Sequence, residues 1–269
     1  MAVDLLVVTY NTSLLLKRLI DTLHSDWEPD VWELHVIDNG STDDTREYLI
    51  EVIGDENKHI TTTSFGSNIG YAKAVNYLST KSKNEFLCAV NADAWFTTNH
   101  VKQVIQSFNE TPEMAILGPK QMDEDKTIRH GGIFWDGSTN PIHRGWNELD
   151  PLDAKYKDKL RCWTVSGSLY YIRRSVWDDL THCMNYQDIM ENPDGAFLPT
   201  PHFFEETFCS VHAQYHGYQV WYDGKIETAG HTWGASEDIY GMSRRYFDIS
   251  KDIYIGACDR HGIRHEYSK

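Results

Sequence analysis

Two neighbouring glutamates, Glu205 and Glu206, are the side chains of this sequence best suited to acid–base chemistry. They follow Phe203 and Phe204 and open a segment whose pattern predicts a helix that ends near Gly217. A carboxylate behind an aromatic wall at a helix start can remove a proton from a hydroxyl group. Acidic residues are also common in the first helical turn simply because of the helix dipole. The pair therefore indicates a catalytic site only together with the other polar clusters of the chain.

Two of these polar clusters end apolar runs in the first part of the chain. Thr9-Tyr10-Asn11 closes the first run, and Asp38-Asn39 closes the second. A carboxylate and an amide at neighbouring strand ends can recognise the donor edge of a nucleotide base. Similar sequences also form ordinary turns and helix caps. Either cluster alone leaves both interpretations open, and their pairing favours a binding site.

A third cluster, Asn68-Ile69-Gly70, precedes a helical pattern. Glycine lets a ligand approach the backbone closely, and a helix N-terminus favours a phosphate group. The spacing of its glycines excludes the G-x-G-x-x-G dinucleotide fingerprint. A capped junction between loop and helix is the ordinary alternative, so this cluster predicts a nucleotide contact only in company with the others.

The fourth cluster, Asn91-Ala92-Asp93, has the chemistry of a metal site. A carboxylate at a strand end can hold Mg²⁺ or Mn²⁺ while diphosphate oxygens fill the remaining positions. A neutral imidazole at His231, much later in the chain, could complete the metal shell or contact the diphosphate. An isolated histidine is as often structural, and a single carboxylate predicts weak metal affinity in the absence of nucleotide.

These clusters alternate with patterns that predict an α/β fold, with a Rossmann-like, mostly parallel central sheet flanked by helices. Short apolar runs predict strands at residues 5–10, 32–37, 60–64 and 85–90. Helical spacing of apolar residues follows each run, with Ser13 and either Asp43 or Asp44 as the expected caps. Because the carboxyl ends of parallel strands meet at one edge of a sheet, the four clusters are expected to converge there.

The composition excludes several classes of protein. The formal net charge of −15 disfavours general affinity for nucleic acid. No apolar run reaches the roughly 20 residues of a membrane span, although peripheral membrane contact stays open. The cysteines form no CxxC pair, and the first residues lack the basic region of a signal peptide. Together these features predict a cytoplasmic protein with reduced thiols.

The order and content of the clusters resemble family 2 glycosyltransferases of the GT-A fold, of the rhamnosyl- and galactofuranosyl-transferase kind, over about residues 3–236. The resemblance implies inverting transfer of a sugar from a nucleotide-diphosphate sugar, most often a UDP-sugar, to an acceptor hydroxyl group. The acceptor would be a glycan, a lipid-linked glycan or another hydroxyl compound. Mn²⁺ or Mg²⁺ would assist the departure of the diphosphate.

The resemblance also implies a role for each cluster. Glu206 matches the carboxylate that deprotonates the acceptor, and Glu205 would contact the acceptor or orient the site. Asp93 matches the metal-binding position, with His231 as the second metal or diphosphate contact. The residues implied to hold the nucleotide and its diphosphate are Thr9, Tyr10, Asn11, Asp38, Asn39, Asn68, Gly70, Asn91 and Ala92. Asn76 matches a further asparagine that is frequent in this family.

We expect a single domain over residues 1–269, with a nucleotide-sugar half at 1–117, an acceptor and catalytic half at 118–236, and a C-terminal helical segment at 237–269. Residues 184–201 are expected to form a long loop or lid, and residues 238–258 an amphipathic helix. Arginines and histidines of the acceptor half are candidate contacts to the diphosphate or the acceptor. They are Arg129, His130, His143, Arg144, Arg173 and Arg174. The pair Arg173-Arg174 fits a solvated helix start equally.

Two other functions fit parts of this pattern. A sugar-phosphate nucleotidyltransferase would need a basic triphosphate loop after the first strand, where Lys17 and Arg18 lie only within the expected helix. A non-catalytic module that binds nucleotide or carbohydrate would keep Asp38 without needing the glutamate pair. His212 and His216 lie four residues apart, but the segment lacks the glutamate of the HExxH motif, so a zinc protease is not expected.

Overall fold

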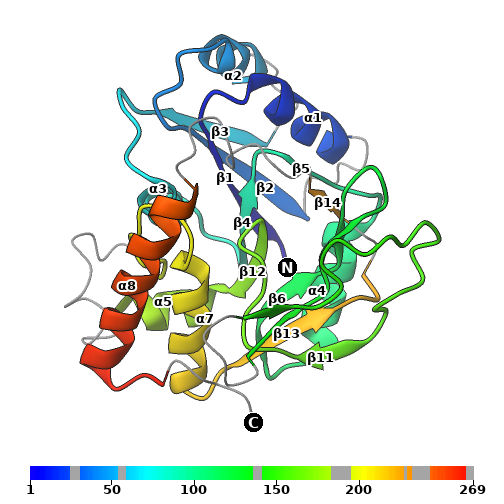
Figure 1. Ribbon diagram of the computed structural model, residues 1–269. Helices are drawn as coiled ribbons and strands as arrows, with labels where there is room; N and C mark the ends of the chain where they lie inside the picture. Colours follow the sequence, from blue (N-terminus) through cyan, green and yellow to red (C-terminus); the bar gives the residue numbers. More distant parts are fainter. Residues whose placement is uncertain are drawn as a thin grey trace.

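The computed structural model describes residues 1–24, 31–53, 59–135, 141–182, 195–226, 229–231 and 243–264. Within these ranges, an eight-stranded sheet with the order β11-β13-β6-β12-β4-β1-β2-β3 forms the centre of the molecule. Helices flank this sheet (Figure 1). The predicted α/β architecture with a mostly parallel sheet is confirmed.

The first part of the chain builds the parallel side of the sheet. Neighbouring strands here all pair in parallel. The strands are β1 (Val3–Thr9), β2 (Trp32–Asp38), β3 (Ile60–Ser64) and β4 (Phe86–Asn91). The connecting helices are α1 (Ser13–His24), α2 (Thr45–Ile53) and α3 (Tyr71–Ser79). Each predicted strand is thus found within two residues of its expected bounds.

The later part of the chain adds a mixed side to the same sheet. Strand β12 runs antiparallel to both β4 and β6, whereas β13 runs parallel to β6. The strands are β6 (Met114–Pro119), β11 (Lys159–Arg161), β12 (Leu169–Arg173) and β13 (Gln219–Asp223). The helices are α4 (His100–Glu110), α5 (Arg174–His182), α7 (Glu205–Tyr215) and α8 (Ser243–His261).

Short strands form two small additional sheets. A four-stranded sheet has the order β5-β14-β7-β8, and β9 pairs with β10. Their bounds are Ala94–Trp95 for β5, Gln121–Met122 for β7, Ile128–His130 for β8, Ile133–Phe134 for β9, Ile142–His143 for β10 and Ala229–His231 for β14. Strand β14 lies between β5 and β7, so it carries a late segment of the chain to the end of β4.

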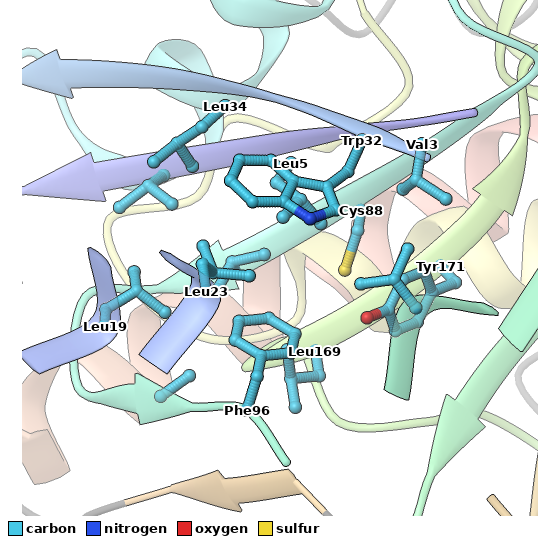
Figure 2. Close-up of a cluster of buried hydrophobic side chains, with 14 of the residues drawn as sticks. Val3, Leu5, Leu19, Leu23, Trp32, Leu34, Cys88, Phe96, Leu169 and Tyr171 are labelled. Carbon is cyan, nitrogen blue, oxygen red and sulfur yellow. The ribbon is translucent and has the colours of Figure 1, made fainter. Parts of the chain in front are cut away.

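Two apolar clusters, one on each face of the central sheet, form most of the core, and a third cluster includes buried residues of α7 and α8. Along β1, Leu5 and Val7 join one cluster, whereas Leu6 joins the other, as the alternation of a strand requires. Helices α1, α2 and α4 contribute to the first cluster, and α3, α5 and α7 to the second. Figure 2 shows Leu19 and Leu23 of α1 beside Trp32 of β2 in the first cluster. Truncating a fully buried leucine such as Leu19 to alanine would cost about 2–5 kcal/mol of stability.

Asp43 determines where two helices begin. Its Oδ2 accepts the backbone N–H of Ser13 at 3.2 Å, and its Oδ1 accepts the N–H of Thr45 at 3.1 Å. The expected cap of α2 is thereby confirmed. The prediction that Ser13 caps α1 is wrong, because Ser13 is the first residue of the helix and its amide needs an acceptor, which comes from the loop after β2.

Several expectations concern parts of the chain that are only partly described. Residues 183–194 of the expected lid and 232–242 before α8 lie outside the described residues, while α8 confirms a C-terminal helix. Among the described helices, none is both long and apolar enough to cross a membrane. The described cysteines, Cys88, Cys162, Cys209 and Cys258, are buried free thiols.

Candidate active site

Asn39 joins the loops that follow β1, β2 and β3. Its backbone N–H donates to the carbonyl of Thr9 at 2.9 Å, and its Oδ1 accepts the N–H of Ile69 at 2.9 Å. Its Nδ2 donates to Oδ1 of Asn68 at 3.0 Å, and that same oxygen accepts the N–H of Gly70 at 2.9 Å. The first three sequence clusters therefore form one hydrogen-bonded group at the carboxyl edge of the sheet, as predicted.

Asn11 and Asp38 hold the same edge together from the first two strands. Asn11 has a left-handed backbone with φ of 54°. Its N–H donates to Oγ of Ser41 at 3.0 Å, and its Oδ1 accepts the N–H of Thr42 at 2.7 Å. Asp38 is buried and accepts the N–H of Ser41 at 2.8 Å. Beside them Tyr10 is 45% exposed, so this edge presents an aromatic ring to solvent.

Two glycines are required by this geometry. Gly40 has φ of 85°, and a Cβ on it would lie 2.7 Å from the backbone of Ser67. Gly70 has φ of 91° at the N-terminal cap of α3. Because α3 follows the carboxyl end of β3, its N-terminus, with the positive end of its dipole, lies at the predicted nucleotide edge.

Asp93 lies at the same edge, between β4 and β5, and is 5% exposed. Strand β5 pairs with β14, and Ala94 is the direct partner of His231. Paired residues of antiparallel strands have Cα atoms about 4.5–5.5 Å apart. The backbone of His231 therefore lies beside that of Asp93, although the two are far apart in sequence. For His231, only the backbone belongs to the part of the chain that the structure describes.

The glutamate pair begins α7 immediately after a strained turn. Phe203 and Phe204 have φ of 70° and 67°, a conformation that costs roughly 1–2 kcal/mol for each residue with a side chain. Their rings pack against α8: Phe204 lies 5.1 Å from Phe247 and 5.3 Å from Tyr254 between ring centroids. The packing of α8 thus stabilises the turn that orients Glu205.

Gly167 lies between Glu206 and the carboxyl edge of the sheet, where the nucleotide clusters lie. We call this edge of the sheet, with the loops joined by Asn39, the donor edge. A Cβ on Gly167 would lie 3.2 Å from both Cγ and Cδ of Glu206, so the carboxyl group packs directly on this glycine. Tyr71, the first residue of α3, donates its hydroxyl to the carbonyl of Gly167 at 3.2 Å. The next residue, Ser168, accepts the backbone N–H of Asn91 at 3.0 Å through its carbonyl. The loop at Gly167 therefore connects the glutamate pair with the end of β4.

Burial raises the pKa of both glutamates above the usual range of a carboxyl group. For Glu205, burial is the larger cause and the neighbouring charge of Glu206 adds to it. For Glu206, burial is the main cause, and hydrogen bonds from its own turn oppose it. Burial also raises the pKa of Tyr71, and the charges of Glu205, Glu206 and, more weakly, Asp93 add to the shift. The tyrosine hydroxyl thus lies within the field of both the glutamate pair and the metal candidate.

Residues 4–180, well over half of the chain, match the family described as Glycosyl transferase family 2. The chain belongs to this family. No curated protein matches the sequence.

Solved structures of glycosyltransferases share the fold of this family 2 chain. The mannosyltransferase PcManGT from Pyrobaculum calidifontis, in complex with GDP-Man and Mn²⁺, matches with a TM-score of 0.64 at 13% identity over 96% of this chain and 64% of that one. GalNAc-T7 with UDP, GalNAc and Mn²⁺ matches with a TM-score of 0.69 at 16% identity over 96% and 48%. S. aureus TarS 1–349 with UDP-GlcNAc matches with a TM-score of 0.61 at 18% identity over 97% and 72%. The chain spans less than two thirds of the length of the first two proteins.

Some residues of this family 2 site carried no signal in the sequence. Only the fold places Gly167 against Glu206 and Tyr71 against Gly167. Gln121 of β7 is 1% exposed and accepts a hydrogen bond from Oγ of Ser168 at 2.5 Å. Its buried Nε2 has no hydrogen-bond partner among the described residues. An unsatisfied buried donor costs about 1–3 kcal/mol.

The side chain of Asn76 binds the backbone of Phe197. Its Nδ2 donates to the carbonyl of Phe197 at 2.9 Å, and its Oδ1 accepts the N–H of Phe197 at 3.0 Å. The side chain is fully buried. Both ends of the Asn76 amide therefore hold the segment that leads toward α7.

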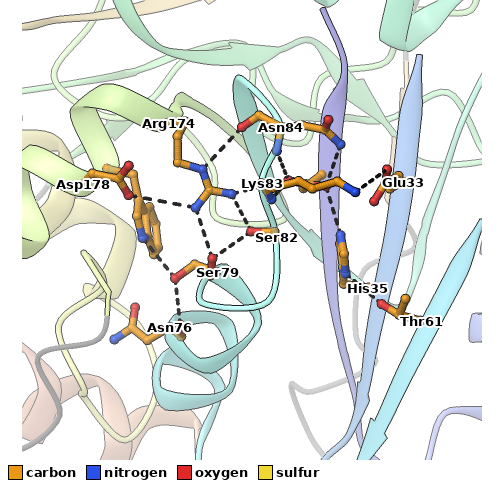
Figure 3. A network of polar contacts seen from close by, with 12 residues as sticks. Glu33, His35, Thr61, Asn76, Ser79, Ser82, Lys83, Asn84, Arg174 and Asp178 are labelled. Atoms are coloured by element: carbon orange, nitrogen blue, oxygen red, sulfur yellow. Dashed lines mark hydrogen bonds and ion pairs between the residues drawn. The ribbon is translucent and has the colours of Figure 1, made fainter. Parts of the chain in front are cut away.

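Arg173 and Arg174 are at the opposite edge of the sheet from the clusters. Because β12 runs antiparallel, its carboxyl end lies beside the amino ends of β1 and β4. Arg173 donates to the carbonyls of Met114 and Phe108 at 2.7 and 2.8 Å. Figure 3 shows Arg174 with Ser82 and Asn84, whose carbonyl accepts from Nε at 3.3 Å. A contact of this pair with the diphosphate or the acceptor is therefore not supported, whereas the alternative of a helix start agrees with α5, which begins at Arg174.

The other arginines of the acceptor half also have structural partners. Arg144 makes two 2.8 Å bonds to the carboxylate of Asp158 and lies over the rings of Tyr156 and Tyr222. Arg129 bonds Asp123 at 2.8 Å. The predicted contacts of these two arginines to a substrate are not supported, because their guanidinium groups hold loops of the acceptor half together.

Among the described residues, Asp4, Glu33 and His35 form the one group of three side chains with metal-binding chemistry. This group lies at the amino edge of the sheet. Thr9 is five residues further along β1, or about 17 Å. The oxygens of Asp4 accept bonds from Asn84, from the N–H of Lys83 and from His35 at 2.7–2.9 Å. Figure 3 shows His35 beside Thr61, whose hydroxyl lies 2.7 Å from the Nδ1 of His35. This network stabilises the strand starts and is too far away to hold a metal at the donor edge.

Proposed function

We propose that this family 2 protein transfers a sugar from a nucleotide-diphosphate sugar to an acceptor hydroxyl group with inversion at the sugar carbon. The observation that carries the proposal is the contact of Glu206 with Gly167, one residue from the hydrogen bond between Ser168 and Asn91. This arrangement holds a carboxylate beside the edge where the nucleotide clusters converge. A binding module would need the clusters but not this carboxylate.

Glu206 would act as the general base. Its carboxylate would accept the proton of the acceptor hydroxyl as the oxygen attacks the sugar carbon from the face opposite the leaving diphosphate. A single displacement of this kind inverts the configuration at that carbon. A base works best when its pKa lies near the working pH, and burial moves the pKa of Glu206 in that direction. Glu205, with Thr200 as a hydrogen-bond donor at 3.3 Å, would orient the acceptor.

Asp93 and His231 would hold a divalent cation, Mn²⁺ or Mg²⁺. A buried carboxylate at a strand end and an imidazole from the adjoining strand make a donor set that suits Mn²⁺. The cation would supply positive charge that stabilises the departing diphosphate. Asn91 and Ala92 would line the diphosphate, and the N-terminus of α3 after Gly70 would add its dipole.

The nucleotide would lie across the loops joined by Asn39. Asp38 and Asn11 would face the base, with Thr9, Tyr10 and Asn68 completing the pocket. Two of the similar structures contain uridine nucleotides and one contains GDP-Man. We propose a uridine donor, because the carboxylate of Asp38 can accept the N–H of a uracil edge. The acceptor would be a hydroxyl compound such as a glycan or a lipid-linked glycan.

Thermal denaturation in the presence of UDP, dTDP, GDP or CDP, each with and without Mn²⁺, tests the donor site. UDP with Mn²⁺ at one hundred times its Kd should raise Tm by about 5 °C or more, because a ligand of the folded state stabilises it by mass action. Asp93→Asn should remove the Mn²⁺-dependent part of the rise. Asp248→Asn, an exposed residue of α8, is the matched control. A nucleotide-induced rise without any turnover of UDP-sugars would support a binding module instead.

A further inference from the structure

Helix α7 ends with two histidines whose side chains face one another. His212 lies in the last turn and His216 at the C-terminal cap. Their Nε2 atoms are 3.1 Å apart, and their ring centroids are 4.9 Å apart. Residues four apart lie on the same face of a helix, and long side chains lean toward its N-terminus, so the ring of His216 reaches back over that of His212. Neither histidine has a part in the proposed sugar transfer.

This separation matches two ligands of one divalent metal ion. Metal–nitrogen bonds to histidine are about 2.0–2.1 Å long. Two nitrogens 3.1 Å apart at that bond length subtend an angle of about 100° at the ion, between the octahedral and tetrahedral values. The pair already has this geometry without any movement of the backbone.

A metal ion can replace the hydrogen bond between the Nε2 atoms of the two rings. Without a metal, Nε2 of His216 can donate its hydrogen to the Nε2 lone pair of His212. When an ion binds, His216 releases that hydrogen to solvent and takes up a proton at Nδ1 of its exposed ring. Each ring then presents an Nε2 lone pair to the ion.

The surroundings of the pair favour entry of a cation from one side. His212 is 1% exposed and packs on the ring of Phe208 at 5.6 Å, so its position is held firmly. His216 lies on the surface beside Tyr215. The chain carries a formal net charge of −15, which raises the local concentration of cations. Within the described part of the chain, no third histidine, cysteine or carboxylate converges on the pair, so water would complete the shell.

We propose that His212 and His216 form a second metal site, which takes imidazole-preferring divalent cations such as Cu²⁺, Ni²⁺ and Zn²⁺. Two nitrogen ligands without a carboxylate favour these ions over Mn²⁺ and Mg²⁺. The site is separate from the donor edge, because His212 lies six residues, or about 9 Å along the helix, beyond Glu206. A bound ion would stabilise the last turn of α7, the helix that has the glutamate pair in its first turn.

Calorimetric titration of the tag-free chain with Ni²⁺ and Zn²⁺, without nucleotide, tests this proposal. The Asp93→Asn background is used throughout, so that any cation at the donor edge does not contribute. One ion per chain should bind with micromolar affinity, and His216→Ala should weaken that affinity at least tenfold. His182→Ala is the matched control, since His182 is an exposed histidine at the end of α5. It should bind as the background does.

Thermal denaturation gives a second measurement that does not depend on heats of binding. Ni²⁺ should raise the Tm of the background chain and of His182→Ala, but not that of His216→Ala. Because His216 lies on the surface, its replacement should leave the fold intact, and the metal-free Tm reports this directly. No binding by the background chain, or equal binding by His216→Ala, would overturn the proposal. Equal binding would move the ion to another group, such as that of Asp4 and His35.

Discussion

Replacing Gly167 by alanine tests the contact on which the proposed mechanism depends. The new Cβ would lie 3.2 Å from Cγ and Cδ of Glu206 and 3.4 Å from its Oε2. Carbon atoms in contact prefer separations of about 3.5–4.0 Å. The side chain of Glu206 would therefore have to move by a few tenths of an ångström, away from its position beside the donor edge.

This displacement should reduce turnover much more than stability. A misplacement of 1 Å in a reacting group can cost about 100-fold in rate, so a shift of 0.3–0.5 Å corresponds to a loss of roughly 4–10-fold in kcat. Overpacking costs about 1–3 kcal/mol in a tight core. The lower entropy of the unfolded chain offsets about 0.4–1 kcal/mol of that cost. The variant should therefore stay folded, with an unchanged KM for the donor because the nucleotide loops are untouched.

The assay is steady-state turnover of the donor sugar, measured together with thermal denaturation. Gly256→Ala is the matched control, because a Cβ there meets nothing within 4 Å. It lies in α8, where alanine should stabilise the helix by about 1 kcal/mol without affecting kcat. If Gly167→Ala stayed folded and kept the wild-type kcat, Glu206 could not act from its position against this glycine.

Three further changes probe the same site. Glu206→Gln should lower kcat by about 100-fold or more with little change in UDP affinity, and normal turnover in a folded variant would refute its role as the base. Burial raises the pKa of Glu205 from 4.5 in the unfolded chain to about 8 in the folded protein. As pH rises from 4.5 to about 8, the unfolded chain therefore loses this proton first, and the free energy of unfolding falls. Glu205→Gln should therefore raise Tm relative to wild type more at pH 8 than at pH 5, and equal differences in melts at the two values would contradict this reasoning. Asn39→Ala should cost about 1–3 kcal/mol in denaturant unfolding and weaken UDP binding, because it breaks the bonds to Asn68 and Ile69.

The nucleotide half could be predicted from the sequence because its information is local. The apolar runs of β1, β2 and β4 are buried strands, and the polar clusters follow closely after the ends of the strands. Parallel pairing then brings the clusters to one edge, whatever the details of packing. The bonds of Asn39 to the loops of Thr9 and Asn68 confirm that convergence. The roles proposed for these residues and for Asp93 remain predictions.

The acceptor half could not be predicted in the same way, because strand direction and long-range packing decide it. Arg173 and Arg174 lie far from the donor edge only because β12 runs antiparallel, which no local pattern in the sequence indicates. Asn76 has a buried partner 121 positions away, and its residue type alone does not reveal that partner.

The sequence by itself thus determined which strands form in the first part of the chain, which clusters end them and which pair of glutamates is the candidate for acid–base chemistry. Only the tertiary structure decided that Gly167 lies against Glu206, that Tyr71 bonds Gly167 from 96 positions away and that His231 adjoins Asp93. The physical reason is that strand formation depends on neighbouring side chains. Contacts across the sheet depend instead on the order and direction in which distant strands pair.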